Sequence, residues 1–205
     1  MRMLTKTLLA AAVLATTPML ANAESDFVSG TGSASAQLDF QITIPRILFL
    51  RVGTGTDFAD NATVDMISFN VPGADLGNGT SVAATAASGD LGNGAVTARV
   101  LGNGGNVTLT STTLGALSNG AGSTISYSQI ETAVTALGGV GGVPMPHPAL
   151  ADTGTGSVAL ASTLGIVDRG ATWTFSYAND NVVAPGTYGG AGVNNGRVTY
   201  TAATP

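Results

Sequence analysis

The sequence predicts an all-β protein that folds as an antiparallel β-sandwich with one short surface helix, and three observations support this. Apolar and polar residues alternate over short runs, which is the period of a strand with one buried face. Gly, Asn or Asp bounds each run, and the dipeptide Asn-Gly, which tolerates the positive φ angles of tight hairpins, recurs along the chain. About ten such runs follow one another at the spacing of a sandwich.

The first strand is expected at residues 38–44, where every second residue is apolar. These apolar residues are Leu38, Phe40, Ile42 and Ile44. Pro45 interrupts the pattern, because proline has no N–H to donate to a ladder, and a strand at 47–52 follows it. The other strands are expected at residues 64–71, 80–87, 95–101, 107–112, 123–127, 157–162, 171–177 and 197–202.

Residues 128–137 have the pattern of the surface helix. Ser128 and Glu131 have the spacing of a capping box, in which each side chain accepts a hydrogen bond from the backbone of the other residue. The apolar residues that share one helical face are Ile130, Val134 and Leu137. Two glycines then stop the helix, which we expect to cross one end of the sandwich.

Residues 1–23 have the features of a secretory signal peptide. Arg2 and Lys6 give a positive start, an apolar run follows at residues 8–14, and Ala21-Asn22-Ala23 matches a cleavage site with small residues. The apolar run is shorter than the about 20 residues that span a bilayer. We therefore expect a bacterial protein that is exported through the periplasm and secreted or held at the cell surface, without membrane insertion after cleavage.

The rest of the chain is expected to form one domain behind a short leader. Residues 24–35 are small and polar and are expected to form a flexible N-terminal segment. Strand patterns then continue to the end of the chain without a change of composition. Residues 36–205 are therefore expected to form a single β-sandwich domain.

The composition excludes several classes of function. Cleavage after residue 23 removes Arg2 and the only lysine, Lys6, which leaves five Arg, twelve acidic residues and a net charge of −7. Such a chain lacks the basic patch that nucleic acid or an anionic lipid surface requires. It has no Cys and one His, which excludes thiol nucleophiles, disulfides, iron–sulfur clusters and Cys/His zinc sites. We expect no cofactor.

The residues needed for catalysis are also scarce. His147 is the only imidazole and lies in the proline-rich stretch 144–148, where we expect a solvent-exposed side chain. The nucleophile elbow G-x-S-x-G is absent from the sequence. Glu occurs only at Glu24 and Glu131, and no pair of acids stands out for glycoside hydrolysis. The chain is therefore not expected to be an enzyme.

The densest acidic cluster of the chain supplies candidate metal ligands. Its carboxylates are Asp57, Asp60 and Asp65, and these are the calcium candidates. Their spacing differs from that of a D-x-D-x-D-G calcium loop, and the glycine of that loop is missing. A solvated loop is therefore favoured over a metal site.

Trp173, the only tryptophan, and Tyr177 are candidate aromatic contacts. Together with Phe175 they lie on one face of the strand at 171–177. An exposed aromatic face would suit the sugar rings of a carbohydrate ligand. A buried one would anchor the core, and this interpretation is favoured because aromatic residues make up only 5% of the chain.

Three C-terminal stretches resemble the end of secreted bacterial β-sandwich subunits. They are residues 171–175 (ATWTF), 184–188 (APGTY) and 198–202 (VTYTA). The turn followed by an alternating closing strand is similar to archaic chaperone–usher pilins of the spore-coat-U type, and also to WxL cell-wall-binding domains. Residues 38–44 resemble the first strand of pilin-like domains. The resemblance implies an immunoglobulin-like or pilin-like sandwich and a role in a fimbrium or in cell adhesion.

Two interpretations of residues 38–44 remain open. The segment pairs within its own sheet, or it fills an incomplete sandwich of a neighbouring copy, with Leu38, Phe40, Ile42 and Ile44 as the donor residues. The low charge favours association, because charged residues are the commonest protection of sheet edges. We expect a structural or surface subunit that self-associates or attaches, with another copy or a cell-surface polysaccharide as partner. The alternative is a secreted carbohydrate- or cell-wall-binding module.

Overall fold

The computed structural model describes residues 25–140 and 143–205. It divides the chain into two compact units, Met1–Ile44 and Pro45–Pro205. The second unit contains every strand among the described residues, the first of which begins at Leu48. The predicted signal peptide, residues 1–23, lies outside the described residues.

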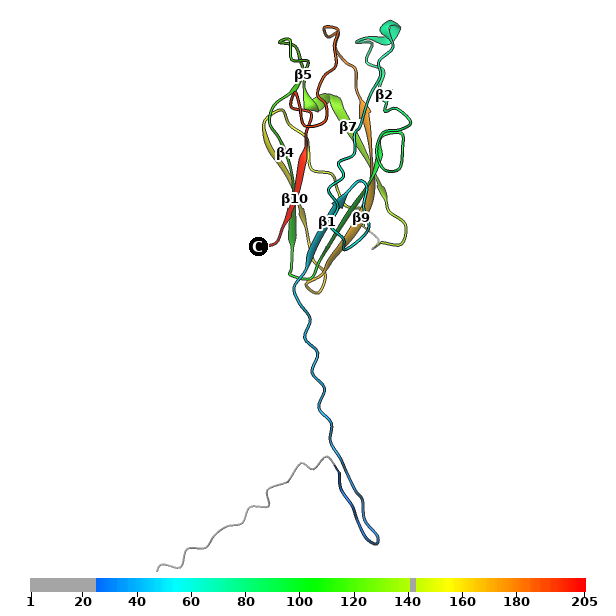
Figure 1. The fold of residues 1–205 in the computed structure, drawn as a ribbon, viewed down its shortest axis with the longest axis vertical. Helices are drawn as coiled ribbons and strands as arrows, with labels where there is room; N and C mark the ends of the chain where they lie inside the picture. The colour runs from blue at the N-terminus through cyan, green and yellow to red at the C-terminus, as the bar shows by residue number, and fades with distance from the viewer. Residues whose placement is uncertain (1–24, 141–142) are drawn as a thin grey trace, which may run out of the picture. The chain divides into compact units, whose positions relative to one another are not determined.

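The unit Pro45–Pro205 is built from antiparallel sheets, which confirms the predicted all-β fold (Figure 1). The larger sheet has the order β1-β3-β9-β2, and β7 pairs with β9 on the side away from β3. In the order β1, β3, β9, β2 and β7, the bounds of these strands are Leu48–Val52, Ala95–Gly102, Val167–Tyr177, Val82–Ala83 and Ile130–Ala136. The smaller sheet has the order β10-β4-β8, with bounds Thr199–Ala203, Val107–Thr113 and Gly154–Leu160. A short hairpin joins β5 and β6, Leu117–Ser118 and Thr124–Ile125. Two 3-10 turns, η1 and η2, are Gly73–Asp75 and Tyr127–Gln129.

The core lies between the two sheets and follows from alternation along their central strands. On β9 the side chains of Trp173, Phe175 and Tyr177 point inward, while those of the polar residues between them are more exposed. Val107 and Leu109 of β4 contribute the opposite side of the core and are fully buried. In each sheet the apolar residues of the alternating pattern therefore face the core and the polar residues face outward, as expected for a sandwich.

The predicted helix at residues 128–137 is wrong. Ser126, not Ser128, caps the single 3-10 turn η2, and its side chain accepts a hydrogen bond from the backbone N–H of Ser128. The following residues form β7, in which Ile130 pairs with Tyr177 and Val134 with Trp173 of β9. Ile130 and Val134 are four residues apart, a spacing that fits both one face of a helix and one face of a strand. The ladder with β9 decides in favour of the strand.

Tight turns occur where the sequence predicts them, though not always at the expected residue. Asn93 and Gly94 have φ angles of 53° and 77°, and Ala95 N–H bonds to Gly92 O at 3.0 Å, which is a hairpin turn. Further on, the two left-handed residues are Asn194 and Asn195, so this turn is centred one residue before the Asn-Gly dipeptide at residues 195–196.

Several predicted strands are shorter than expected or do not form ladders. Residues 64–71 contribute only an isolated bridge between Phe69 and Ala84, and the strand expected at 80–87 is reduced to Val82–Ala83. Residues 25–47 contain neither helix nor strand. Among the described residues no helix has the length and hydropathy of a membrane span.

Candidate self-association site

Residues 38–44 present one apolar side and one polar side. Leu38, Phe40, Ile42 and Ile44 are 76–85% exposed. Asp39, Gln41 and Thr43, which alternate with them, are exposed as well. Four large apolar side chains at this exposure are unusual, because apolar groups of this size normally leave water. The segment therefore has the side-chain pattern of a strand without a ladder.

β10 is an edge of the smaller sheet and a candidate acceptor for such a segment. Within the described sheets it pairs with β4 only. Tyr200 and Ala202 point inward and pack against the core although both are only partly buried, while Thr199, Thr201 and Ala203 are exposed. The strand contains neither a charged residue nor a proline, the two features that commonly prevent strand addition.

β1 forms an edge of the larger sheet beside β10 (Figure 1). Leu50 and Val52 of β1 point toward the core and remain partly exposed, as Tyr200 and Ala202 do on β10. The border between β1 and β10 therefore has incompletely buried apolar side chains on both sheets. An added strand with one apolar face would remove such surface from water.

His147 is partly buried against the core, so its predicted solvent exposure is wrong. Its Nε2 shares a hydrogen bond of 2.7 Å with the Tyr200 hydroxyl. Its ring meets the rings of Trp173 and Phe175 edge-on, at centroid distances of 4.6 and 5.4 Å. Burial lowers the pKa of His147 from 6.5 to about 4, so the imidazole is neutral near pH 7.

The proline-rich stretch is partly buried because it contacts both sheets instead of forming a surface loop. Met145 and Pro148 are fully buried. Met145 N–H donates to Gly170 O at 3.3 Å, and the indole N–H of Trp173 donates to Met145 O at 2.9 Å. Ser111 Oγ of β4 donates to Ala149 O at 3.0 Å. Bonds from its neighbours to both sheets therefore hold His147 against the core.

Trp173 and Tyr177 cannot stack on a sugar in this fold. Trp173 is fully buried and Tyr177 is 5% exposed. Both side chains therefore pack in the core of this structure instead of forming an exposed aromatic platform. The physical reason is that their common strand face is the inner face of β9.

The three calcium candidates do not converge. Asp57 pairs with Arg51 at 3.6 Å and with Arg99 at 3.2 Å. Asp65 instead accepts hydrogen bonds from Thr54, and Asp60 is exposed. In the part of the chain that the structure describes, no three acidic or histidine side chains are grouped to hold a metal ion.

Two hollows on the described surface are small. One, of about 90 Å³, lies between β1 and the loop that follows it, and the other, of about 260 Å³, lies next to Ile166 and Arg169. Both are below the about 300–1,000 Å³ of typical small-molecule sites. Neither is lined by His147, the only imidazole.

A charge network on the outer face of the larger sheet is not predicted by any local sequence pattern. Arg51 contacts Asp57 and Asp90, and Arg99 contacts Asp57 and Asp168. In three of the four ion pairs the partners are 39 to 69 residues apart, so the fold brings them together.

No family model, curated protein or solved structure matches this chain.

Proposed function

We propose that this chain is an exported structural subunit, pilin-like in its mode of assembly, that self-associates through residues 38–44. One copy adds this segment as a strand to the sandwich of another copy. The observation that carries the proposal is the exposure, 76–85%, of four apolar side chains at alternate positions of a segment without secondary structure.

Strand addition would bury the apolar side chains of residues 38–44 and give their backbone hydrogen-bond partners. Burying each large apolar side chain stabilises the complex by about 1.5–3 kcal/mol. Each backbone hydrogen bond of the new ladder adds about 0.5–1.5 kcal/mol. The polar side chains of Asp39, Gln41 and Thr43 then remain on the solvent side, because successive side chains of a strand point to opposite faces.

β10 is the acceptor that fits this segment best. It has one ladder partner in the described sheets, β4, and no charge or proline along its length. Its inward residues Tyr200 and Ala202 border the core, so an added strand beside them turns its own apolar face toward the same core.

The remaining chemistry of the chain also favours a structural role. His147, the only histidine, is engaged by Tyr200 and by aromatic rings inside the sandwich. It therefore does not face a substrate from solvent. The absence of cysteine and the neutral core suit a subunit that works outside the cell without disulfides or cofactors.

The proposal is tested with two double variants of the mature chain. F40E/I42E places two charges on the apolar side of the segment, whereas Q41E/T43E places the same two charges on its polar side. We expect the wild type and Q41E/T43E to form linear multimers in light scattering and electron microscopy, and F40E/I42E to stay monomeric. A monomeric wild type, or an F40E/I42E variant that multimerises like the wild type, would contradict the proposal.

A further inference from the structure

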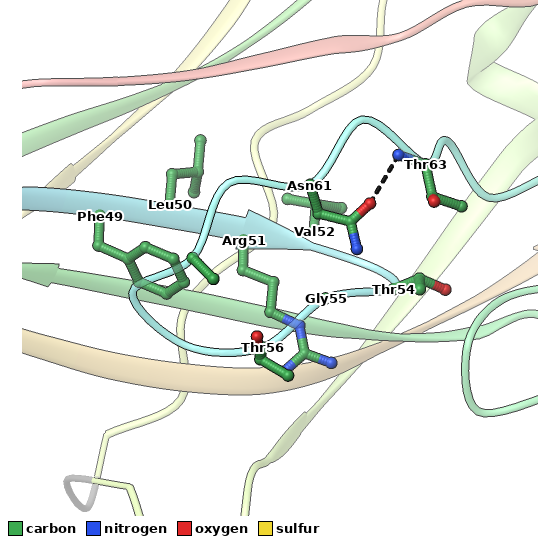
Figure 2. A pocket seen from close by; sticks show the side chains of 10 residues that line it. Phe49, Leu50, Arg51, Val52, Thr54, Gly55, Thr56, Asn61 and Thr63 are labelled. Atoms are coloured by element: carbon green, nitrogen blue, oxygen red, sulfur yellow. Dashed lines mark hydrogen bonds between the residues drawn. The ribbon is translucent and has the colours of Figure 1, made fainter.

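The loop that follows β1 wraps around the edge of this strand. Loop 53–65 leaves β1 after Val52, passes on the side to which Arg51 points, and returns with Asn61 on the side of Leu50 (Figure 2). The hollow of about 90 Å³ between loop and strand is too small for another chain. Among the described residues no backbone hydrogen bond joins the loop to β1. The loop thus covers the edge without extending the sheet.

Asp65 closes the neck of loop 53–65. Its Oδ2 accepts a hydrogen bond from Thr54 N–H at 2.5 Å, and its Oδ1 accepts one from Thr54 Oγ1 at 2.8 Å. Both bonds are strengthened by the charge of the carboxylate. Gly53, with φ of 86°, lies against the same carboxylate, and any Cβ at this position would collide with it. The ends of the loop are therefore held together by one side chain.

The outer half of the loop is held against the sheet by Asp57 and Phe58. Asp57 pairs with Arg51 of β1 and Arg99 of β3. The Phe58 ring lies 5.3 Å from that of Phe49. Phe58 has φ of 64°, which a bulky residue rarely adopts, and it is 63% exposed. A strained and exposed aromatic residue at this place points to a role that depends on the position of the loop.

β10, the neighbouring edge, differs from β1 in sequence. β1 carries the charged residue Arg51, which is part of the network that holds the loop, whereas β10 has no charged residue. Natural sheets block unwanted strand addition by covering an edge or placing charges on it. β1 uses both devices.

We infer that loop 53–65 blocks strand addition at β1 and thereby directs residues 38–44 of an incoming copy to β10. This inference rests on the proposed function, since it concerns where the added strand goes. The Asp65–Thr54 contact is the positioning element: without it the loop opens and the β1 edge becomes a second acceptor.

Hydrogen exchange of the full mature chain tests the inference. Wild type, Asp65→Ala, Asp60→Ala and Thr54→Ala are each compared with the same chain carrying F40E/I42E, which cannot donate a strand. Asp60→Ala is the matched control, because it removes the same charge from an exposed side chain of the same loop. Thr54→Ala removes only the hydrogen bond from Thr54 Oγ1 to Asp65, and this variant replaces Asp65→Ala in the test if Asp65→Ala does not fold.

In wild type and Asp60→Ala we expect assembly to slow exchange about tenfold or more at residues 199–203 and to leave residues 48–52 unchanged. In Asp65→Ala, and to a smaller extent in Thr54→Ala, residues 48–52 should gain the same protection, and particles should branch. Assembly of these variants without any change at 48–52 overturns the inference. Absence of protection at both edges in the wild type overturns the proposed function itself.

Discussion

Arg51 of β1 and Arg99 of β3 lie directly opposite each other in the ladder, and the carboxylate of Asp57 contacts both guanidinium groups. Two like charges at such a pair are destabilising by themselves. Asp90 and Asp168 each contact one of the two arginines as well. The pair is therefore tolerated because three acids from distant parts of the chain surround it.

Replacing Asp57 by Asn should lower the free energy of unfolding by about 1 kcal/mol, because the two arginines then lose their shared partner. For a chain of this size the thermal midpoint falls by about 2–4 °C. Asp60→Asn, which changes an exposed carboxylate of the same loop, should stay within about 0.5 kcal/mol of the wild type. The difference should shrink in about 1 M salt. Equal midpoints for both variants would show that the network contributes nothing.

Stability should fall as the pH drops from about 6.5 to about 4, because burial lowers the pKa of His147 to about 4 in the folded chain. In this window the unfolded chain binds a proton that the folded chain does not, so protonation favours unfolding. The full contribution is on the order of 3 kcal/mol, at about 1.36 kcal/mol for each unit of pKa. Urea midpoints of wild type and His147→Gln measure it, since the variant keeps a polar partner for Tyr200 but cannot titrate. An identical pH dependence of both would contradict this assignment.

Trp173→Phe should destabilise the fold by about 1–3 kcal/mol, because it removes buried volume and the hydrogen bond to Met145 O. The emission of this only tryptophan should shift to longer wavelength on unfolding, which makes it a direct probe of the core. Addition of cell-wall polysaccharide should leave the emission of the folded chain unchanged. A ligand-dependent shift would restore Trp173 as a contact residue.

Leu164→Asn should stabilise the fold by about 0.5 kcal/mol, in contrast to most substitutions. Leu164 is 97% exposed and has φ of 52° in the turn between β8 and β9, where Gly165 follows with φ of 79°. Asn adopts this left-handed conformation more readily, and Asn-Gly is the preferred pair of such turns. Thermal unfolding measures the gain. A lower midpoint for the variant would mean that the Leu164 side chain makes a stabilising contact.

The sequence predicts the central strands well, because the alternation of apolar and polar residues within each strand is a local pattern. The expected strands at 95–101 and 107–112 match Ala95–Gly102 and Val107–Thr113 to within one residue. β9 begins at Val167, four residues before the expected start, because Asp168 and Arg169 interrupt the apolar alternation. Local alternation therefore locates strands whose inner face is apolar throughout.

The sequence failed where contacts between distant segments decide the outcome. β7 has a helix-compatible pattern, and only its ladder with β9 makes it a strand. The prolines beside His147 indicate an exposed loop, whereas its ring contacts the distant residues Trp173, Phe175 and Tyr200. The donor candidates at 38–44 were visible from their alternation. The acceptor edge was not, because sheet order is not written in any single segment.

The most direct test of self-association is a disulfide trap between two singly substituted chains, which is unambiguous because the natural chain has no cysteine. Gln41→Cys marks the polar side of the donor segment, and Thr201→Cys marks the exposed face of β10. Neighbouring strands bring such residues to about 4.5–5.5 Å between Cα atoms, within the reach of a disulfide. Thr155→Cys, an exposed residue of β8, is the control acceptor. We predict that Gln41→Cys forms a cross-linked dimer with Thr201→Cys in preference to Thr155→Cys. Equal or absent cross-linking with the two acceptors would contradict strand addition at β10.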